Sequence, residues 1–258
     1  MCSLGLGLGA FSFAAQAQPD TPPSEAPPAP PAEEAPGPEH DAAVGVVITE
    51  LMYNPASGEG YQPDPEEEPN RRAIPNRVEY VELYNAGDAA VNLRGWRLRD
   101  EDGSTGVIPS GPPLAPGQAV LLIPAEHTEA DFRAAWSVPP AVRVVRLDSW
   151  GPDGLNNLAN GPSAQNEILD LVDGQAQLVD RVNYDDAAPW PSDSPDGPSI
   201  YLVPEVLGPG ADPALSNDDG ASWARSSDGV HGARTAQPGG FYRPGDVGSP
   251  GVVVKPGS

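Results

Sequence analysis

The chemistry that this sequence could support lies in its carboxylates. Glu50 and Glu82 each fall in the middle of a run of β-branched and aromatic residues that is typical of a strand. Period-two alternation places Glu50 on the same face as Ile48 and Met52, so the carboxylate shares a partly apolar surface. Two acids in such positions need either a cation or hydrogen-bond donors.

Two interpretations of these acids stay open. In the first, they pair with Arg94, Arg97, Arg99 or with backbone N–H groups. In the second, they bind Ca²⁺ together with the loop acids Asp64 and Glu66, since Ca²⁺ prefers oxygen ligands. No other cofactor is expected.

Motifs of enzymes are missing from the sequence. There is no G-x-S-x-G, H-E-x-x-H or P-loop pattern, and His40, His127 and His231 lie far apart. A Ser-His-Asp triad would have to assemble from distant segments. The acidic turns at 100–103 and 217–220 lack the twelfth-position Glu of an EF-hand loop, which favours ordinary turns. The chain is therefore expected not to be an enzyme, with a secreted hydrolase as the remaining alternative.

The charge balance restricts the partners. With 37 acidic and 14 basic residues the net charge is -23. Such a surface repels phosphate backbones, so no nucleic-acid partner is expected, and it disfavours docking on anionic membranes. Basic proteins and divalent cations are the natural attractions. The single cysteine, Cys2, excludes a disulfide framework.

The first 43 residues differ in composition from the rest. Residues 1–17 contain an apolar stretch that ends in A-Q-A, which resembles a signal peptide, although no Lys or Arg precedes it. Residues 18–43, rich in Pro, Ala and Glu, are expected to form a disordered spacer. The sequence thus predicts a secreted, periplasmic or cell-surface protein with no transmembrane segment after cleavage.

From residue 44 onward the pattern changes to short hydrophobic runs separated by turns. About nine such runs predict strands, residues 128–136 predict one short helix, and 168–184 predict a β-hairpin about Asp173-Gly174. Alternating βαβ units are not expected. The pattern is typical of an all-β fold, an antiparallel sandwich or barrel with long loops. The domain is expected over 44–252, loop-rich from about 204, with a tail at 253–258.

Seven segments in a fixed order resemble the lamin tail domain family in its bacterial exported form. The ending, ASW at 221–223 followed by GSPG at 248–251, also resembles that of many bacterial members. The seven segments are ITELMYNP at 48–55, EYVELYN at 79–85, VNLRGWRL at 91–98, LAPGQAVL at 114–121, GLNN at 154–157, EILDL at 167–171 and LVDRVNY at 178–184.

The resemblance implies an immunoglobulin-like β-sandwich that works as a binding or structural module and not as an enzyme. The expected function is protein–protein contact at the cell envelope or surface, with an unidentified partner. The alternative is a calcium-stabilised extracellular structural or adhesion domain. The residues expected to hold the core are Trp96, Leu98, Leu121, Ile123, Leu171 and Val182.

Overall fold

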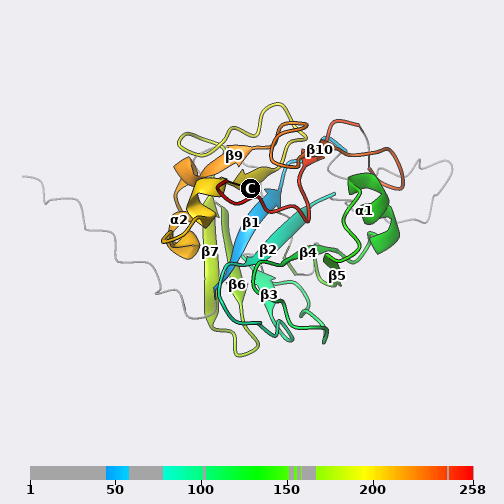
Figure 1. Ribbon diagram of the computed structural model, residues 1–258. Coiled ribbons are helices and arrows are strands. Elements are labelled where there is room, and N and C mark those ends of the chain that lie inside the picture. Colours follow the sequence, from blue (N-terminus) through cyan, green and yellow to red (C-terminus); the bar gives the residue numbers. More distant parts are fainter. Residues whose placement is uncertain are drawn as a thin grey trace, which may run out of the picture. The chain divides into compact units, whose positions relative to one another are not determined.

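Two β-sheets pack face to face in the computed structural model (Figure 1). It describes residues 45–57, 78–100, 103–150, 154–155, 158, 167–242 and 244–257. The expected signal peptide and spacer lie outside these residues. The architecture is mostly β and immunoglobulin-like, as the sequence predicted.

The larger sheet has six strands in the order β5-β4-β2-β1-β8-β9. Its strands are long and apolar in the centre and short at the β9 edge, and almost every residue of β1 and β2 is buried. Both faces of this sheet must therefore be covered. Its strands are β1 (Val46–Met52), β2 (Tyr80–Asn85), β4 (Ala119–Pro124), β5 (Arg143–Leu147), β8 (Ile200–Leu202) and β9 (Trp223–Arg225).

The smaller sheet covers one of these faces. It contains β3 (Arg97–Arg99), β6 (Glu167–Val172) and β7 (Leu178–Tyr184), and the last two form the predicted hairpin. Between the sheets lies one large apolar cluster. It includes Trp96, Leu98, Leu171 and Val182 of the expected core.

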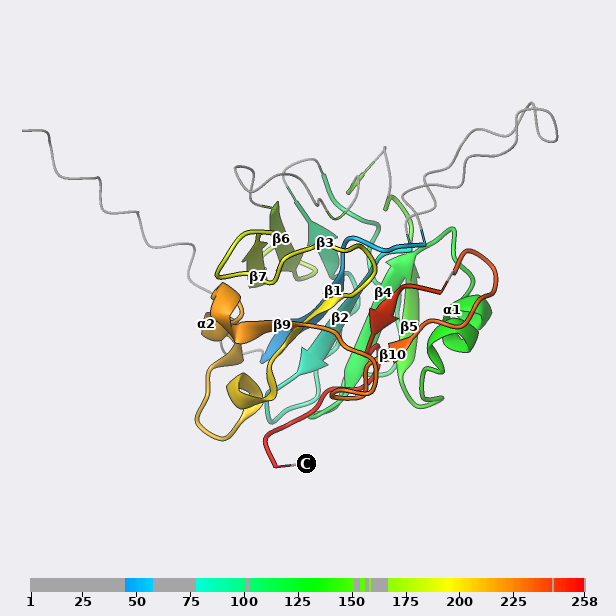
Figure 2. The same ribbon diagram turned by 90° about the horizontal axis from the view of Figure 1, so that it is seen from above.

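A third layer covers the other face of the large sheet (Figure 2). Leu121 and Ile123 point into this second cluster, where they meet Phe132 and Trp136 of α1 (Glu129–Trp136). Thr128 caps the helix by accepting a hydrogen bond from the Asp131 N–H at 3.0 Å. The expected core residues are thus all buried, but on both faces of the sheet.

The chain after residue 203, expected to be rich in loops, also contains short helical and strand elements. It forms the 3-10 turns η1 (Pro204–Leu207) and η2 (Gly220–Ser222), the short helix α2 (Pro213–Ser216), and a β10 (Arg234–Thr235) and β11 (Val247–Gly248) pair. Trp223 lies in the cluster between the sheets, and Tyr242 in the second cluster. The large side chains of Trp223 and Tyr242 thus pack this part of the chain against both faces of the large sheet.

Three expectations about strands need correction. Two of the hydrophobic runs expected to be strands, at 91–99 and 107–108, form strand structure only at Arg97–Arg99. One strand pair departs from the expected antiparallel arrangement. β4 and β5 are parallel, because the chain crosses back through α1 between them. Among the described residues, no helix is long and apolar enough to cross a membrane.

Candidate functional site

Glu50 and Glu82 are directly opposed on the neighbouring strands β1 and β2. The register of β1 shifts between Ile48 and Glu50, so Ile48 faces the cluster between the sheets while Glu50 and Met52 face the outer layer. The expectation that Glu50 shares a face with Ile48 was therefore wrong, because a bulge interrupts the alternation. The two carboxylates lie together in a fully buried site.

Glu50 is surrounded by donors. Its Oε1 accepts hydrogen bonds from the Tyr80 hydroxyl at 2.7 Å, the Ser199 hydroxyl at 2.6 Å and the Ser249 N–H at 2.8 Å. Its Oε2 accepts from the Ser249 hydroxyl at 3.0 Å. Ser226 adds a hydrogen bond to Ser199 at 2.8 Å.

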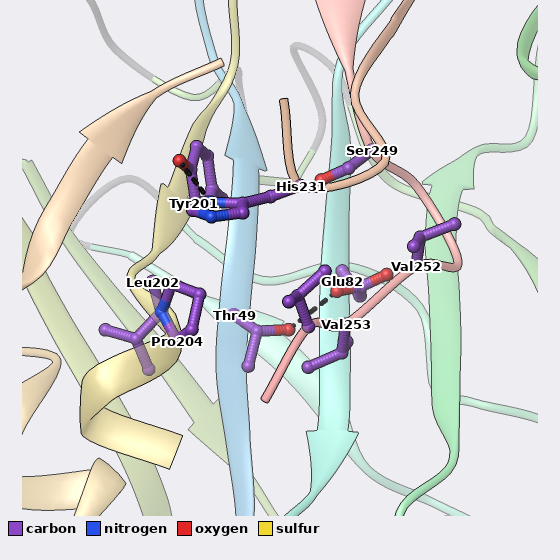
Figure 3. Close-up of a pocket in the computed structure, with 10 residues that line it drawn as sticks. Thr49, Glu82, Tyr201, Leu202, Pro204, His231, Ser249, Val252 and Val253 are labelled. Atoms are coloured by element: carbon purple, nitrogen blue, oxygen red, sulfur yellow. Dashed lines mark hydrogen bonds between the residues drawn. The ribbon is translucent and has the colours of Figure 1, made fainter. Parts of the chain in front are cut away.

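Glu82 has fewer partners. The Thr49 hydroxyl donates to its Oε1 at 2.8 Å, and the Gly251 N–H donates to its Oε2 at 2.7 Å. Figure 3 shows the Thr49 contact and the nearby Val252 and Val253. Both carboxylates therefore receive backbone N–H groups from the C-terminal part of the chain.

We call residues 247–254 the cover segment, because they lie across these two carboxylates. Gly248 approaches so closely that a Cβ there would collide with the Tyr80 hydroxyl and lie 3.0 Å from Glu50 Oε1. Gly251 has a φ of +85°, a left-handed conformation that side chains other than glycine rarely adopt. The two glycines let the backbone itself reach the acids.

Burial perturbs both acids in the same direction. Burial is the main cause that raises the pKa of Glu82 to about 8, and the neighbouring Glu50 carboxylate raises it further. Burial also raises the pKa of Glu50, although the hydrogen bonds from Ser199, Tyr80 and Ser249 oppose this shift. The donors to the two carboxylates described above are hydroxyl and backbone N–H groups.

A small cavity of about 10 Å³ lies beside Glu82 under the cover segment. Its walls also include Tyr201 and His231, whose side chains are hydrogen-bonded at 2.9 Å (Figure 3). A space of this size holds about one water molecule. The carboxylates of Glu50 and Glu82 themselves are almost inaccessible to solvent.

Another buried acid, Asp180, joins the two sheets. Asp180 of β7 accepts hydrogen bonds from the Ile48 N–H at 2.7 Å and from the Asn217 side chain at 2.8 Å. The Asn217 carbonyl in turn accepts from the Trp223 indole at 2.8 Å. Burial raises the pKa of Asp180 to about 8. Its partners belong to β1 and the region after α2, not to the cover segment.

The small sheet holds an acid of the opposite kind. Asp170 accepts from the Arg99 guanidinium at 2.6 Å and from that of Arg181 at 2.6 Å. Burial acts to raise the pKa of Asp170, but the hydrogen bonds and charges of Arg181 and Arg99 outweigh it and hold the pKa below its ordinary value.

Of the two interpretations of Glu50 and Glu82, the hydrogen bonds agree with donors from the backbone and hydroxyl groups. Arg99 pairs with Asp170 instead. Asp64 and Glu66 lie outside the described residues. Within the described part of the chain, no group of three or more metal-type side chains could hold an ion. The calcium hypothesis stays a prediction.

Sequence reasoning missed the hydroxyl donors and the role of the ending. Tyr80 and Thr49 are one or two residues away from the predicted acids, but Ser199 and Ser249 are far along the chain. The one usable signal in the sequence was GSPG at 248–251. Its two glycines have no side chain, so the backbone can approach other groups closely there.

His127, the acidic turn at residue 100 and two tryptophans take part in packing or in closing a turn. His127 is buried against Phe241 and Tyr242. The turn at residue 100 is closed by a hydrogen bond from the Gly103 N–H to Asp100 at 2.7 Å. Trp150 and Trp190 belong to the cluster between the sheets.

Comparison with known families gives one match. The model of the family described as Lamin Tail Domain matches residues 39–186, which is more than half of the 258 residues. It covers β1 to β7, which make up the small sheet and four of the six strands of the large sheet, but not β8, β9 or the cover segment. A search of curated proteins gave no match.

Proposed function

The chain belongs to the lamin tail domain family, and from this we propose that it is a non-enzymatic, exported module that binds a protein partner at the cell envelope or surface. The family's immunoglobulin-like sandwich is often a structural or protein-interaction unit. Export is inferred from the signal-like residues 1–17.

One observation carries the proposal beyond the family. The side chains best suited to chemistry are engaged in holding the layers of the domain together. Glu50 binds Ser199, which directly precedes β8, and the cover segment, and Asp180 binds β1 and Asn217. A buried acid whose oxygens accept from the chain's own donors is poorly placed to act on a substrate. Binding through the surface is the function that remains well supported.

The partner is expected to carry positive charge. The net charge of -23 attracts basic surfaces and accelerates their association, an effect that salt weakens. This excess also argues against nucleic acid as the partner.

Site-specific photo-cross-linking in the source cells tests this function. A photoreactive residue replaces Val107, Leu215 or Val230, which are large apolar side chains exposed by 48%, 68% and 44%. Because these side chains face solvent, the replacement should leave the fold intact. We expect an adduct with an envelope or surface protein from at least one position, and a weaker adduct at high salt.

The same photoreactive group at the fully buried Leu169 is the matched control, and it should give no intermolecular adduct. Recovery of the chain in the cytosol with residues 1–17 attached would contradict export. Absence of any adduct from all three exposed positions would contradict partner binding.

A further inference from the structure

The two opposed carboxylates differ in the number of donors they receive. Glu50 accepts four hydrogen bonds, from Tyr80, Ser199 and twice from Ser249. A group with four donors is best satisfied as an ionised carboxylate, because an ionised carboxylate only accepts. The charge of the pair therefore belongs on Glu50.

Glu82 is the natural holder of a proton. It accepts one hydrogen bond from the Gly251 N–H and one from the Thr49 hydroxyl. A hydroxyl can reverse its role, so a protonated Oε1 can donate to Thr49 while Oε2 still accepts from Gly251. Two like charges in one buried site cannot both be ionised without a large cost.

The cover segment depends on this arrangement. The Ser249 and Gly251 N–H groups bind the two acids, and both acids are fully buried under the segment. The cavity beside Glu82 has room for about one water. When both carboxylates are charged, hydration is the only large further source of stabilisation for the second charge. Water can reach that charge if the cover segment moves away from the sheet.

Other charged or titratable groups around the pair must be considered. On the strands and turns beside it, these include Tyr80, Tyr201 and Glu205, and the buried Asp246, whose pKa is raised by burial, directly precedes the cover segment. His231 lines the cavity, and the Lys255 ammonium lies 5.4 Å from the centre of the Tyr84 ring. The side chains that α1 and β4 contribute to this outer face are apolar.

We propose that residues 247–254 form a proton-controlled cover, closed while Glu82 holds a proton and released from the sheet when Glu50 and Glu82 are both ionised. Release would uncover Thr49 and Tyr201 on the outer face of the large sheet. The uncovered face would then become available to the protein partner. Only this consequence rests on the proposed function. The device itself needs no partner.

Amide hydrogen exchange of the full chain tests the cover directly. The protection factors of Ser249 and Gly251, corrected for the intrinsic pH dependence of exchange, are compared at neutral pH and about two pH units above it. We expect protection to fall about tenfold, because ionisation of Glu82 with a pKa of about 8 falls in this interval and the loss levels off above it. Unchanged protection overturns the proposal.

The variant Glu82→Gln separates titration of Glu82 from other alkaline effects. Its amide nitrogen can donate to Thr49 while its carbonyl accepts from Gly251, which imitates the protonated acid. Protection should stay high at both pH values. An equal loss in Glu82→Gln overturns the proposal.

Three further variants complete the experiment. Asp180→Asn removes a buried acid with a similarly raised pKa that does not touch the cover, so the tenfold change should persist. His231→Asn should also retain it. Gly248→Ala forces the segment off the Tyr80 hydroxyl, so protection should be low at both pH values.

A native-protein measurement decides the matter if Glu82→Gln does not fold. The carboxyl carbon of Glu82 is followed by NMR across the pH range together with the Gly251 amide. If the Glu82 carboxyl carbon and the Gly251 amide change with the same midpoint near pH 8, the result supports the proposed cover. A midpoint near pH 4.5 for Glu82 overturns the proposal. None of these readouts involves a partner, so failure of the cover is distinguishable from failure of partner binding.

Discussion

Asp170 and Glu82 are buried acids in the middle of strands, yet they are held in opposite ways. On the strands beside Asp170 the directly opposed residues are Arg99 and Arg181. On the strands beside Glu82 they are Glu50 and Leu121. Cross-strand neighbours are the main electrostatic environment of a sheet residue, so the small sheet neutralises its acid and the large sheet does not.

The difference shows how the domain uses its third layer. Asp170 has two cations and needs no further cover. Glu82 and Glu50 depend on a proton and on N–H groups from the cover segment, which lies outside the part matched by the family model. The large sheet therefore ties its outer face to the end of the chain.

The largest expected effect is a fall in stability as pH rises from about 5 to 8. The folded protein keeps the protons of Glu82 and Asp180 up to about pH 8, whereas the ordinary values are 4.5 and 3.8. The folded state therefore binds more protons in this window, and each acid removes roughly 1 kcal/mol of stability per pH unit. Urea unfolding at several pH values measures this slope.

The variant Asp180→Asn should flatten that slope by about half. Asp170 acts in the opposite sense: its lowered pKa contributes stability that is lost only as pH falls below about 3.8. A stability that rises steadily from pH 5 to 8 would contradict the assigned environments of Glu82 and Asp180.

The next effect compares truncation of the two kinds of acid. Glu50→Ala should destabilise the domain by about 4 kcal/mol, because the buried donors of Tyr80, Ser199 and Ser249 lose their acceptor. Asp170→Ala should cost only about 1 kcal/mol, because its arginines are partly exposed and can return to water. Denaturant unfolding near pH 6 compares them. Equal costs would remove the distinction.

The sequence predicted the sandwich, the hairpin and the helix because these depend on local signals. Alternating residues mark β6 and β7, and Thr128 with Asp131 marks the start of α1. It also selected Glu50 and Glu82 as unusual, since mid-strand acids need partners.

The features that the sequence did not predict depend on contacts between residues far apart in the chain. Ser199 and Ser249 are ordinary loop residues in sequence and become donors only because the chain returns to β1. The bulge after Ile48 changes which face Glu50 occupies, and alternation alone does not reveal it. The parallel pairing of β5 likewise depends on the path through α1.

A smaller effect is expected from removing one of the two cations of Asp170. Arg99→Ala should cost less than about 1 kcal/mol, because the side chain is 43% exposed and Arg181 still neutralises the carboxylate. The cost should shrink in high salt. Arg94→Ala, at an exposed position, is the control and should cost nothing measurable. A cost above 2 kcal/mol would show that Asp170 needs both cations.

The smallest expected effect is on the response to calcium. If Glu50 and Glu82 were ligands, Ca²⁺ would raise the melting temperature of the native chain and much less that of Glu82→Gln. The Oε2 of Glu82 already accepts from the Gly251 N–H, and a cation cannot share that position with a donor. We therefore expect the difference between melting temperatures in Ca²⁺ and in EDTA to be the same for both proteins. A rise in melting temperature with Ca²⁺ that Glu82→Gln abolishes would mean that Glu50 and Glu82 bind a metal ion and not the cover segment. The acids of both sheets would then be neutralised by cations, arginine side chains at Asp170 and Ca²⁺ at Glu50 and Glu82.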